Sequence, residues 1–155
     1  IGTTSTPEKA EIARAAGADD VVAYSELVAR VHRLTSGTGV VAVYDGVGAA
    51  TFQASLDALR PRGVLVSFGS ASGPVPPFDI QRLNSGGSLY LTRPTAMHYT
   101  ATTAELRSRT DDLFGWLAQG KLRVEIGARY PLDQTRAAFE ALESRNTSGK
   151  VLLIH

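Results

Sequence analysis

The chain has 155 residues, 43% of them hydrophobic, and a formal net charge of +1, values that are ordinary for about one globular domain. Its 16 basic and 15 acidic residues form no basic run, so nothing indicates a nucleic-acid partner. Cysteine is absent, which excludes disulfides, thiolate zinc sites and a cysteine nucleophile, and no apolar stretch reaches the roughly 18 residues that span a bilayer. We therefore expect a cytoplasmic protein without membrane contact.

The first part of the chain alternates helical and strand patterns. Ile1 has the character of the last residue of a strand, so we expect a fragment, or a chain whose first part is missing. Thr6 before Pro7 predicts a helix N-cap, and Gly17 predicts the end of that helix. The predicted elements are a helix at 7–16, a strand at 20–24, a helix at 26–35, a strand at 40–44, a helix at 49–59, a turn at 60–63 and a strand at 64–69.

The same alternation continues after a loop at 70–78, which contains three prolines. The predicted elements there are a helical turn at 79–84, a strand at 88–92, a helix at 104–119 with Leu106, Leu113, Trp116 and Leu117 facing inward, a strand at 123–130, a helix at 133–145 and a strand at 150–155. Strands that alternate with helices predict an α/β fold with a doubly wound parallel sheet.

The central strand is followed by a turn that could hold a nucleotide. A run of β-branched and aromatic residues at 40–44 predicts a strand buried on both faces, and an acid and two glycines follow it at 45–48. Strand, glycine turn and helix form the unit whose carboxyl end holds nucleotides in open α/β sheets. The turn comes close to G-x-G-x-x-G, but Thr51 stands in place of the third glycine. The alternative stays open that glycine only relieves crowding and that Asp45 is a cap.

Residues 1–9 indicate which dinucleotide would bind. In the dinucleotide-binding fold, an acid at the tip of the second strand accepts a hydrogen bond from the 2′-hydroxyl of NAD. Here the tip carries hydroxyl side chains and then Lys9, without an acid at the tip itself. Hydroxyls and a cation favour a 2′-phosphate, so the pattern predicts NADP(H) rather than NAD. The alternative is a capped helix with a solvated Lys9.

No catalytic or metal site is evident in the sequence. His32, His98 and His155 lie on a helix, in a loop and at the terminus, without metal-ligand spacing. The acidic residues form no obvious catalytic pair. Arg93, directly before Pro94, could orient a phosphate, although a simple strand end is the more common reason for such a pair. The sequence therefore predicts no metal site and leaves the catalytic residues unknown.

Several segments in the same order resemble a known family. They are Ile-Gly-Thr-x-Ser-Thr-x-x-Lys at 1–9, Val-Tyr-Asp-x-Val-Gly at 43–48, Val-Ser-Phe-Gly at 66–69, Gly-Ser-Leu-Tyr-Leu-Thr-Arg-Pro at 87–94 and Gly-Lys-Val-Leu-Leu-Ile at 149–154. Through them the chain resembles the C-terminal part of the zinc-free, zeta-crystallin-like quinone oxidoreductases of the medium-chain dehydrogenase/reductase superfamily. The resemblance implies an NADPH:quinone oxidoreductase that transfers hydride to a small-molecule quinone or α,β-unsaturated carbonyl.

The resemblance also implies which residues contact the cofactor. Ser5, Thr6 and Lys9 would meet the adenosine 2′-phosphate, with Tyr24 close by and Arg145 approaching from the C-terminal segment. Gly46 would pass near the adenosine side. The nicotinamide half would be lined by Phe68, Gly69, Ser70 and Ala71, and covered by Pro94, Thr95 and Ala96. The family commonly has asparagine where this chain has Ser70.

The resemblance implies an incomplete architecture. Residues 1–120 would form a Rossmann NADP-binding domain lacking its first strand and glycine loop, and 121–155 would return to an absent catalytic domain. We expect the missing strand to leave the strands at 20–24 and 40–44 without a shared neighbour, and the chain alone to be unstable and inactive. The edge strand at 88–92 would pair with its copy in a homodimer. The alternative function is a nucleotide-binding or structural, crystallin-like protein without turnover.

Overall fold

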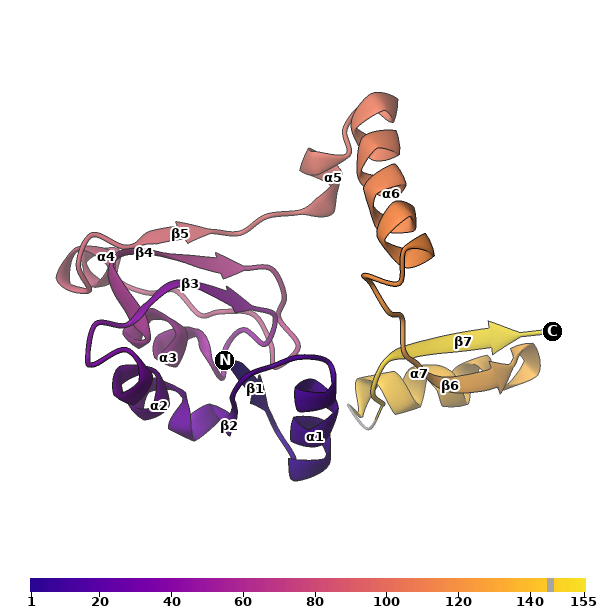
Figure 1. Ribbon diagram of the computed structural model, residues 1–155, viewed down its shortest axis with the longest axis horizontal. Helices are drawn as coiled ribbons and strands as arrows, with labels where there is room; N and C mark the ends of the chain where they lie inside the picture. Colours follow the sequence, from indigo (N-terminus) through magenta and orange to yellow (C-terminus); the bar gives the residue numbers. More distant parts are fainter. Residues whose placement is uncertain (145–146) are drawn as a thin grey trace. The chain divides into compact units, whose positions relative to one another are not determined.

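The structure is a computed structural model that describes residues 1–144 and 147–155, which form two compact units, 1–98 and 99–155. The first unit confirms the predicted alternation of strands and helices (Figure 1). Its elements are β1 (Gly2–Thr4), α1 (Pro7–Ala15), β2 (Val21–Ala23), η1 (Tyr24–Glu26), α2 (Leu27–Leu34), β3 (Val40–Asp45), α3 (Phe52–Asp57), β4 (Leu59–Ser67), α4 (Gln81–Ser85) and β5 (Tyr90–Thr92), and α5 (Ala96–Tyr99) lies at its boundary with the second unit.

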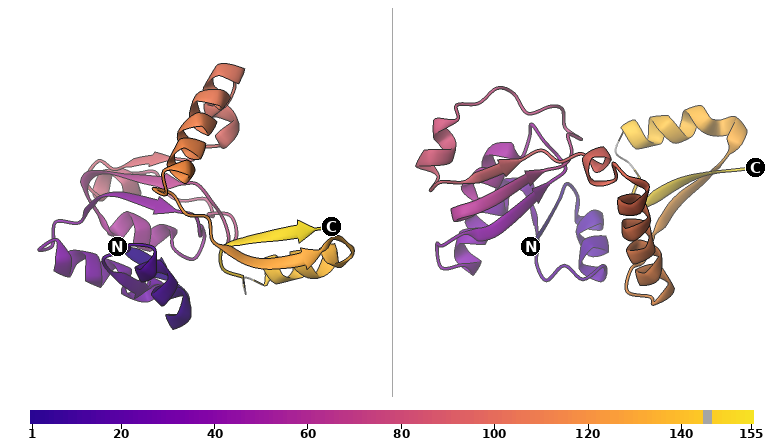
Figure 2. Two further views of the ribbon diagram at one scale, coloured as in Figure 1. Left: turned by 45° about the vertical axis from the view of Figure 1, so that its right-hand side comes forward. Right: turned by 90° about the horizontal axis from the view of Figure 1, so that it is seen from above.

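The strands of the first unit pair in parallel, as predicted for an α/β fold. One sheet has the order β1-β2 and the other has the order β3-β4-β5. Figure 2 shows β3, β4 and β5 side by side, with α3 against one face of the sheet. There Phe52 and Leu56 of α3 are buried against Leu65 of β4 and against Leu89. This core holds the carboxyl ends of β3, β4 and β5 at one rim.

A groove separates the two sheets of the first unit. It has a volume of about 410 Å³, and its walls include Gly2 of β1 and Ala42 of β3. The prediction that β2 borders this gap is wrong, because β2 lies on the other side of β1, where the Gly2 N–H donates to the Asp20 carbonyl at 2.7 Å. In the doubly wound order 3-2-1-4, the second strand and not the third neighbours the first.

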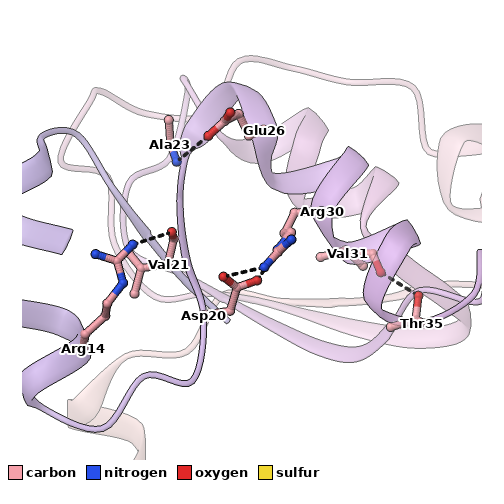
Figure 3. Close-up of polar contacts among 8 residues, drawn as sticks. All are labelled: Arg14, Asp20, Val21, Ala23, Glu26, Arg30, Val31 and Thr35. Carbon is pink, nitrogen blue, oxygen red and sulfur yellow. Dashed lines mark hydrogen bonds and ion pairs between the residues drawn. The ribbon is translucent and has the colours of Figure 1, made fainter. Parts of the chain in front are cut away.

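The outer edge of β2 is covered by side chains (Figure 3). Arg14 donates from Nη2 to the Val21 carbonyl at 3.3 Å, and the Ala23 N–H donates to a Glu26 carboxylate oxygen at 3.4 Å. Both backbone groups face away from β1. In a parallel strand, the N–H and C=O of one residue point to the same side and those of the next residue point to the other side. These contacts occupy two of the backbone groups that an added strand would need.

An ion pair next to this edge joins α2 to the start of β2. Arg30 of α2 contacts the Asp20 carboxylate with two nitrogens (Figure 3). The hydrogen bond from the Arg30 guanidinium holds the pKa of Asp20 below its usual value. Because the pair is close to solvent, it orients α2 more than it stabilises the fold.

The structure corrects two predicted boundaries near the centre of the chain. The predicted turn at 60–63 belongs to β4, which starts at Leu59 opposite Val40 and is irregular up to Val64. Pro61 and Gly63 resemble a turn in sequence, but a strand tolerates them where its ladder is interrupted. The helix predicted to start at 49 begins at Phe52, because the residues before it form a turn organised by Asp45.

The second unit contains α6 (Thr103–Ala118), β6 (Ile126–Pro131), η2 (Leu132–Gln134), α7 (Thr135–Glu143) and β7 (Lys150–Ile154). Thr102 and Glu105 form a capping box that starts α6, and β6 pairs in parallel with β7. The predicted inward face of α6 is wrong for this chain, since Trp116 is 47% exposed and the helix buries no residue. Among the described residues, no helix has the length and apolar character that crossing a membrane requires.

Candidate functional site

The turn after β3 is organised by one buried carboxylate. The side chain of Asp45 belongs to a residue that is only 4% exposed, and it accepts hydrogen bonds from the N–H groups of Val47 (2.8 Å) and Gly48 (3.0 Å). The hydroxyls of Thr51 and Ser55 donate to it at 2.8 Å each. The residue that departs from G-x-G-x-x-G therefore supplies a hydrogen bond to this carboxylate. Sequence reasoning missed this role of Thr51 and Ser55. The only hint of it in the sequence is that residues with hydroxyl groups follow the acid.

The hydrogen bonds around Asp45 keep it ionised. Burial raises the pKa of the Asp45 carboxyl, but hydrogen bonds from the Gly48 N–H, the two hydroxyls and the Val47 N–H outweigh it, so the pKa lies below its ordinary value. A carboxyl with a lowered pKa stabilises the fold above its unfolded-state pKa of about 3.9, and that stabilisation is lost as the pH falls through its folded-state pKa. Asp45 thus contributes most to stability at neutral pH.

We expect Asp45→Ala to lower the free energy of unfolding of the full-length protein by about 3 kcal/mol at neutral pH, because it leaves two buried hydroxyls and two N–H groups without their acceptor. Urea unfolding at neutral and acidic pH measures the effect, and the difference between variant and parent should shrink below about pH 4. Asp19→Ala, which removes an exposed acid, is the control. An equal difference at both pH values would contradict the assigned charge effect.

The loop after β4 is hydrogen-bonded to this turn along its backbone. The carbonyl of Asp45 accepts from the N–H groups of Phe68 at 2.8 Å and Gly69 at 3.3 Å, and the carbonyl of Gly46 accepts from Ala71 at 3.2 Å. Both segments follow neighbouring parallel strands, so they leave the sheet at the same rim. Gly46 and the loop predicted to line the nicotinamide half are therefore adjacent in the structure.

Glycine is required where the two segments touch. A Cβ atom on Gly69 would lie 2.5 Å from the Gly46 carbonyl oxygen, and one on Gly46 would lie 2.9 Å from the Phe68 ring. Gly48 has a φ of 91°, and a Cβ there would meet the Gly73 carbonyl at 2.6 Å. The close approach leaves the ring of Phe68 packed on Gly46, while the residue stays 55% exposed. An exposed aromatic ring at this rim can pack against a planar ligand group.

The end of β5 lies next to the same rim. Arg93 donates from Nη1 to the Ser67 carbonyl at 2.9 Å, which ties the segment after β5 to the end of β4. The predicted residues Pro94, Thr95 and Ala96 follow directly. Arg93 and Ser70 also line a largely apolar pocket of about 500 Å³ under the proline-containing loop. Arg93 directly follows the last residue of β5, which confirms the predicted strand end, and its contact with Ser67 is an addition from the structure.

The tip of β1 carries the remaining predicted contacts. Thr6 is the N-cap of α1, and its hydroxyl accepts from the Lys9 N–H at 3.3 Å; Ser5 beside it is exposed. The nearest acid is Glu8 in the first helical turn, where hydrogen bonds from its own backbone N–H and from Thr6 lower its pKa. Tyr24 starts η1 after β2. Arg145 lies outside the described residues. Contacts with the cofactor stay a prediction for the five residues named for this end, which are Ser5, Thr6, Lys9, Tyr24 and Arg145.

Known proteins are similar to this chain in sequence and in fold. A quinone oxidoreductase from Salmonella typhimurium is 46% identical over 99% of this chain and 48% of its own length, and a 2-haloacrylate reductase from a Burkholderia species is 38% identical over 99% and 47%. The solved Escherichia coli quinone oxidoreductase complexed with NADPH superimposes with a TM-score of 0.93 at 42% identity, over 99% of this chain and 49% of that one. The chain thus spans about half the length of the curated relatives it matches.

These similarities extend along both units of the chain. A family model described as zinc-binding dehydrogenase matches residues 16–153, from the end of α1 to β7. That span includes the parallel sheet and the hydrogen-bonded loops at its carboxyl rim. On this match, the chain belongs to the zinc-binding dehydrogenase family.

Proposed function

We propose that this chain is the cofactor-binding C-terminal part of an NADPH-dependent oxidoreductase that transfers hydride to a quinone or another α,β-unsaturated carbonyl. The observation that carries the proposal is the pair of loops joined at the carboxyl rim of β3 and β4, where open α/β sheets bind dinucleotides. The NADPH complex of the Escherichia coli relative and the names of the other relatives support it. In this proposal residues 1–120 belong to the NADP-binding domain and 121–155 to the catalytic domain.

The two ends of the cofactor would be held by different parts of the first unit. The N-terminus of α1, with Lys9 and the hydroxyls of Ser5 and Thr6, offers positive charge and donors for the 2′-phosphate. The rim at Phe68 would hold the nicotinamide half. The resemblance implies that Gly46 lies near the adenosine side, but because Gly46 packs against the Phe68 ring, we propose it for the nicotinamide half instead. Bound NADPH would supply the hydride, and this chain's residues would bind and orient it. The proton that completes carbonyl reduction would come from a donor outside the residues assigned here.

The family description names zinc, but the residues of this chain do not fit a zinc site. Cysteine is absent, and no three His, Asp or Glu side chains in 1–144 and 147–155 gather as a metal site. We therefore propose that the described residues of this chain hold no zinc ion.

The groove between β1 and β3 would hold the first strand of the Rossmann sheet. It is lined by apolar side chains from α2, among them Leu27 and Val31, and by Val43 of β3. A strand placed there could pair with β1 on one side and with β3 on the other, giving the order 3-2-1-4. This apolar groove is the structural reason for proposing that another part of the protein completes the sheet with a strand.

We further propose a homodimer through β5. At the outer edge of β2, Arg14 and Glu26 occupy two backbone groups. At β5, by contrast, no other strand in the described part of the chain pairs with its outer edge, and Tyr90 is 64% exposed. An exposed strand edge pairs readily with another strand. A second copy of the chain would extend the sheet across a two-fold axis.

The double variant Tyr90→Lys/Thr92→Lys should convert this dimer to a monomer, because like charges would face one another across the paired edges. Light scattering after gel filtration of the full-length protein measures the mass. Ala23→Lys, on the covered β2 edge, should leave the mass unchanged. A monomeric unsubstituted protein would overturn the proposed dimer.

The alternative function is a nucleotide-binding or structural protein without turnover. It is favoured by the lack of an assignable catalytic acid in this chain. Fluorescence titration with NADPH tests binding, and the loss of NADPH absorbance in the presence of a quinone tests turnover. Both should be positive for the full-length protein if the proposed reaction is right. Binding without oxidation would favour the nucleotide-binding form of the alternative. No binding would contradict the proposed reaction and favour the structural form of the alternative.

A further inference from the structure

The buried carboxylate of Asp45 determines the shape of the turn that follows it. Four groups between residues 47 and 55 donate to it, namely the N–H groups of Val47 and Gly48 and the hydroxyls of Thr51 and Ser55. Two of these donors belong to the turn itself, and Ser55 lies one helical turn into α3. The carboxylate therefore links the end of β3, the turn and the start of α3 at one point.

The turn in turn determines the position of the loop after β4. Beyond the bonds that Asp45 and Gly46 accept through their carbonyls, Ser72 binds the turn three times: its N–H and its hydroxyl donate to the Val47 carbonyl at 2.7 and 2.8 Å, and its hydroxyl accepts from the Ala50 N–H at 3.0 Å. The Ala49 N–H also donates to the Gly73 carbonyl at 3.1 Å. A displacement of the turn would therefore displace the loop.

We propose that Asp45 is a positioning residue for the nicotinamide half of the cofactor, acting with Thr51 through the turn on Phe68 and Ser70. This inference rests on the proposed function, since it takes from it which end of the cofactor meets this rim. Although Asp45 lines the groove, it is only 4% exposed and four donors bind its carboxylate, so no direct ligand contact is assigned to it. Its effect would come from holding the loop in the geometry that binds the ring.

The arrangement of the strands predicts that the two ends of the cofactor respond differently. The 2′-phosphate end is assigned to the tip of β1, which lies across the groove from β3, while the Phe68 loop follows β4 on the far side of β3. At about 5 Å per strand position, three positions separate the tips of β1 and β4 if one strand fills the groove. Loss of the Asp45 hydrogen bonds should therefore weaken the binding only of ligands that carry the nicotinamide half and reach the Phe68 loop.

The experiment compares two ligands on the full-length protein by calorimetry: NADPH, and adenosine 2′,5′-bisphosphate, which lacks the nicotinamide half. Asp45→Ala should raise the Kd of NADPH about tenfold or more, and leave that of the bisphosphate within about twofold. Thr51→Val removes one hydroxyl at nearly constant shape and should show the same selectivity with a smaller effect. Thr51→Ser keeps the hydroxyl and should restore the parental affinities.

Each outcome decides the inference. Selective loss of NADPH affinity in Asp45→Ala and Thr51→Val, with rescue in Thr51→Ser, supports it. An equal loss for both ligands would indicate general destabilisation and overturn it, as would parental affinities in all variants. If Asp45→Ala does not fold, the two Thr51 variants decide by the same criteria. If the unsubstituted protein binds neither ligand, the proposed function fails first, and this inference with it.

Discussion

Lys9→Ala in the full-length protein is expected to raise the Kd of NADPH by about 10- to 100-fold and to leave that of NADH within about twofold. The charge-assisted contact with a phosphate is worth about 1.5–3 kcal/mol, and only NADPH carries the 2′-phosphate. The N-terminus of α1, capped by Thr6, would keep part of the attraction for the anion, so some preference should remain. Fluorescence titration with both cofactors gives the two constants.

Two further variants test the electrostatic explanation of the Lys9 effect. Lys121→Ala removes an exposed lysine of the second unit and should change neither constant. Glu8→Gln removes the carboxylate from the first turn of α1 and should strengthen NADPH binding about two- to fivefold, because an anion beside the phosphate repels it. Equal losses for NADPH and NADH in Lys9→Ala would show that Lys9 does not recognise the 2′-phosphate.

Residues 1–155 expressed alone are expected to show no cooperative thermal unfolding at or above room temperature. On the groove side of β1 and β3, the part of the chain that the structure describes supplies no strand. A strand there would bury its own side chains against Leu27, Val31 and Val43, and each buried aliphatic side chain contributes about 1.5–3 kcal/mol. A few such residues equal much of the 5–15 kcal/mol that stabilises an ordinary domain.

Circular dichroism melting tests this expectation, with the full-length protein as the reference. The full-length protein should unfold cooperatively, and the 155-residue chain should lose its signal over a broad range or lack native helix content from the start. Co-expression of the chain with the segment that would precede it should restore the sharp transition. A sharp transition of the 155-residue chain alone, with a midpoint close to that of the full-length protein, would contradict the proposal that the groove needs a strand.

Local sequence signals predicted many of the elements well. Thr6-Pro7 starts α1 and the β-branched run at 40–44 forms β3, because capping and backbone preference act within a few residues. The prediction that β3 is buried on both faces is wrong, since Val41 is 58% and Tyr44 73% exposed. The glycine-rich turn after β3 was recognised as a possible nucleotide turn. The part played by Thr51 could not be predicted, since its partner Asp45 precedes it by six residues and only the folded turn brings them together.

Other errors arose where distant segments decide the outcome. Pro61 and Gly63 resemble a turn locally, but this region is part of β4, because β4 pairs with β3 from Leu59 onward. The apolar side chains of α6 predicted an inward face, but periodicity does not say what covers a face, and Trp116 remains half exposed. In the first case, strand pairing overrode the local preference for a turn. In the second, no packed segment of the described chain covers the apolar face that the local pattern predicts.

The amino-acid sequence by itself determined that this protein alternates strands with helices, builds parallel sheets and carries hydroxyls and Lys9 where NAD-binding folds place an acid. Only the tertiary structure decided that Gly46 and Phe68 touch, that a groove separates β1 from β3, and that the β2 edge is covered. The reason is the range of the forces: backbone preference and periodicity act over a few residues, whereas the neighbour of a strand depends on hydrogen bonds and packing between segments far apart in the chain.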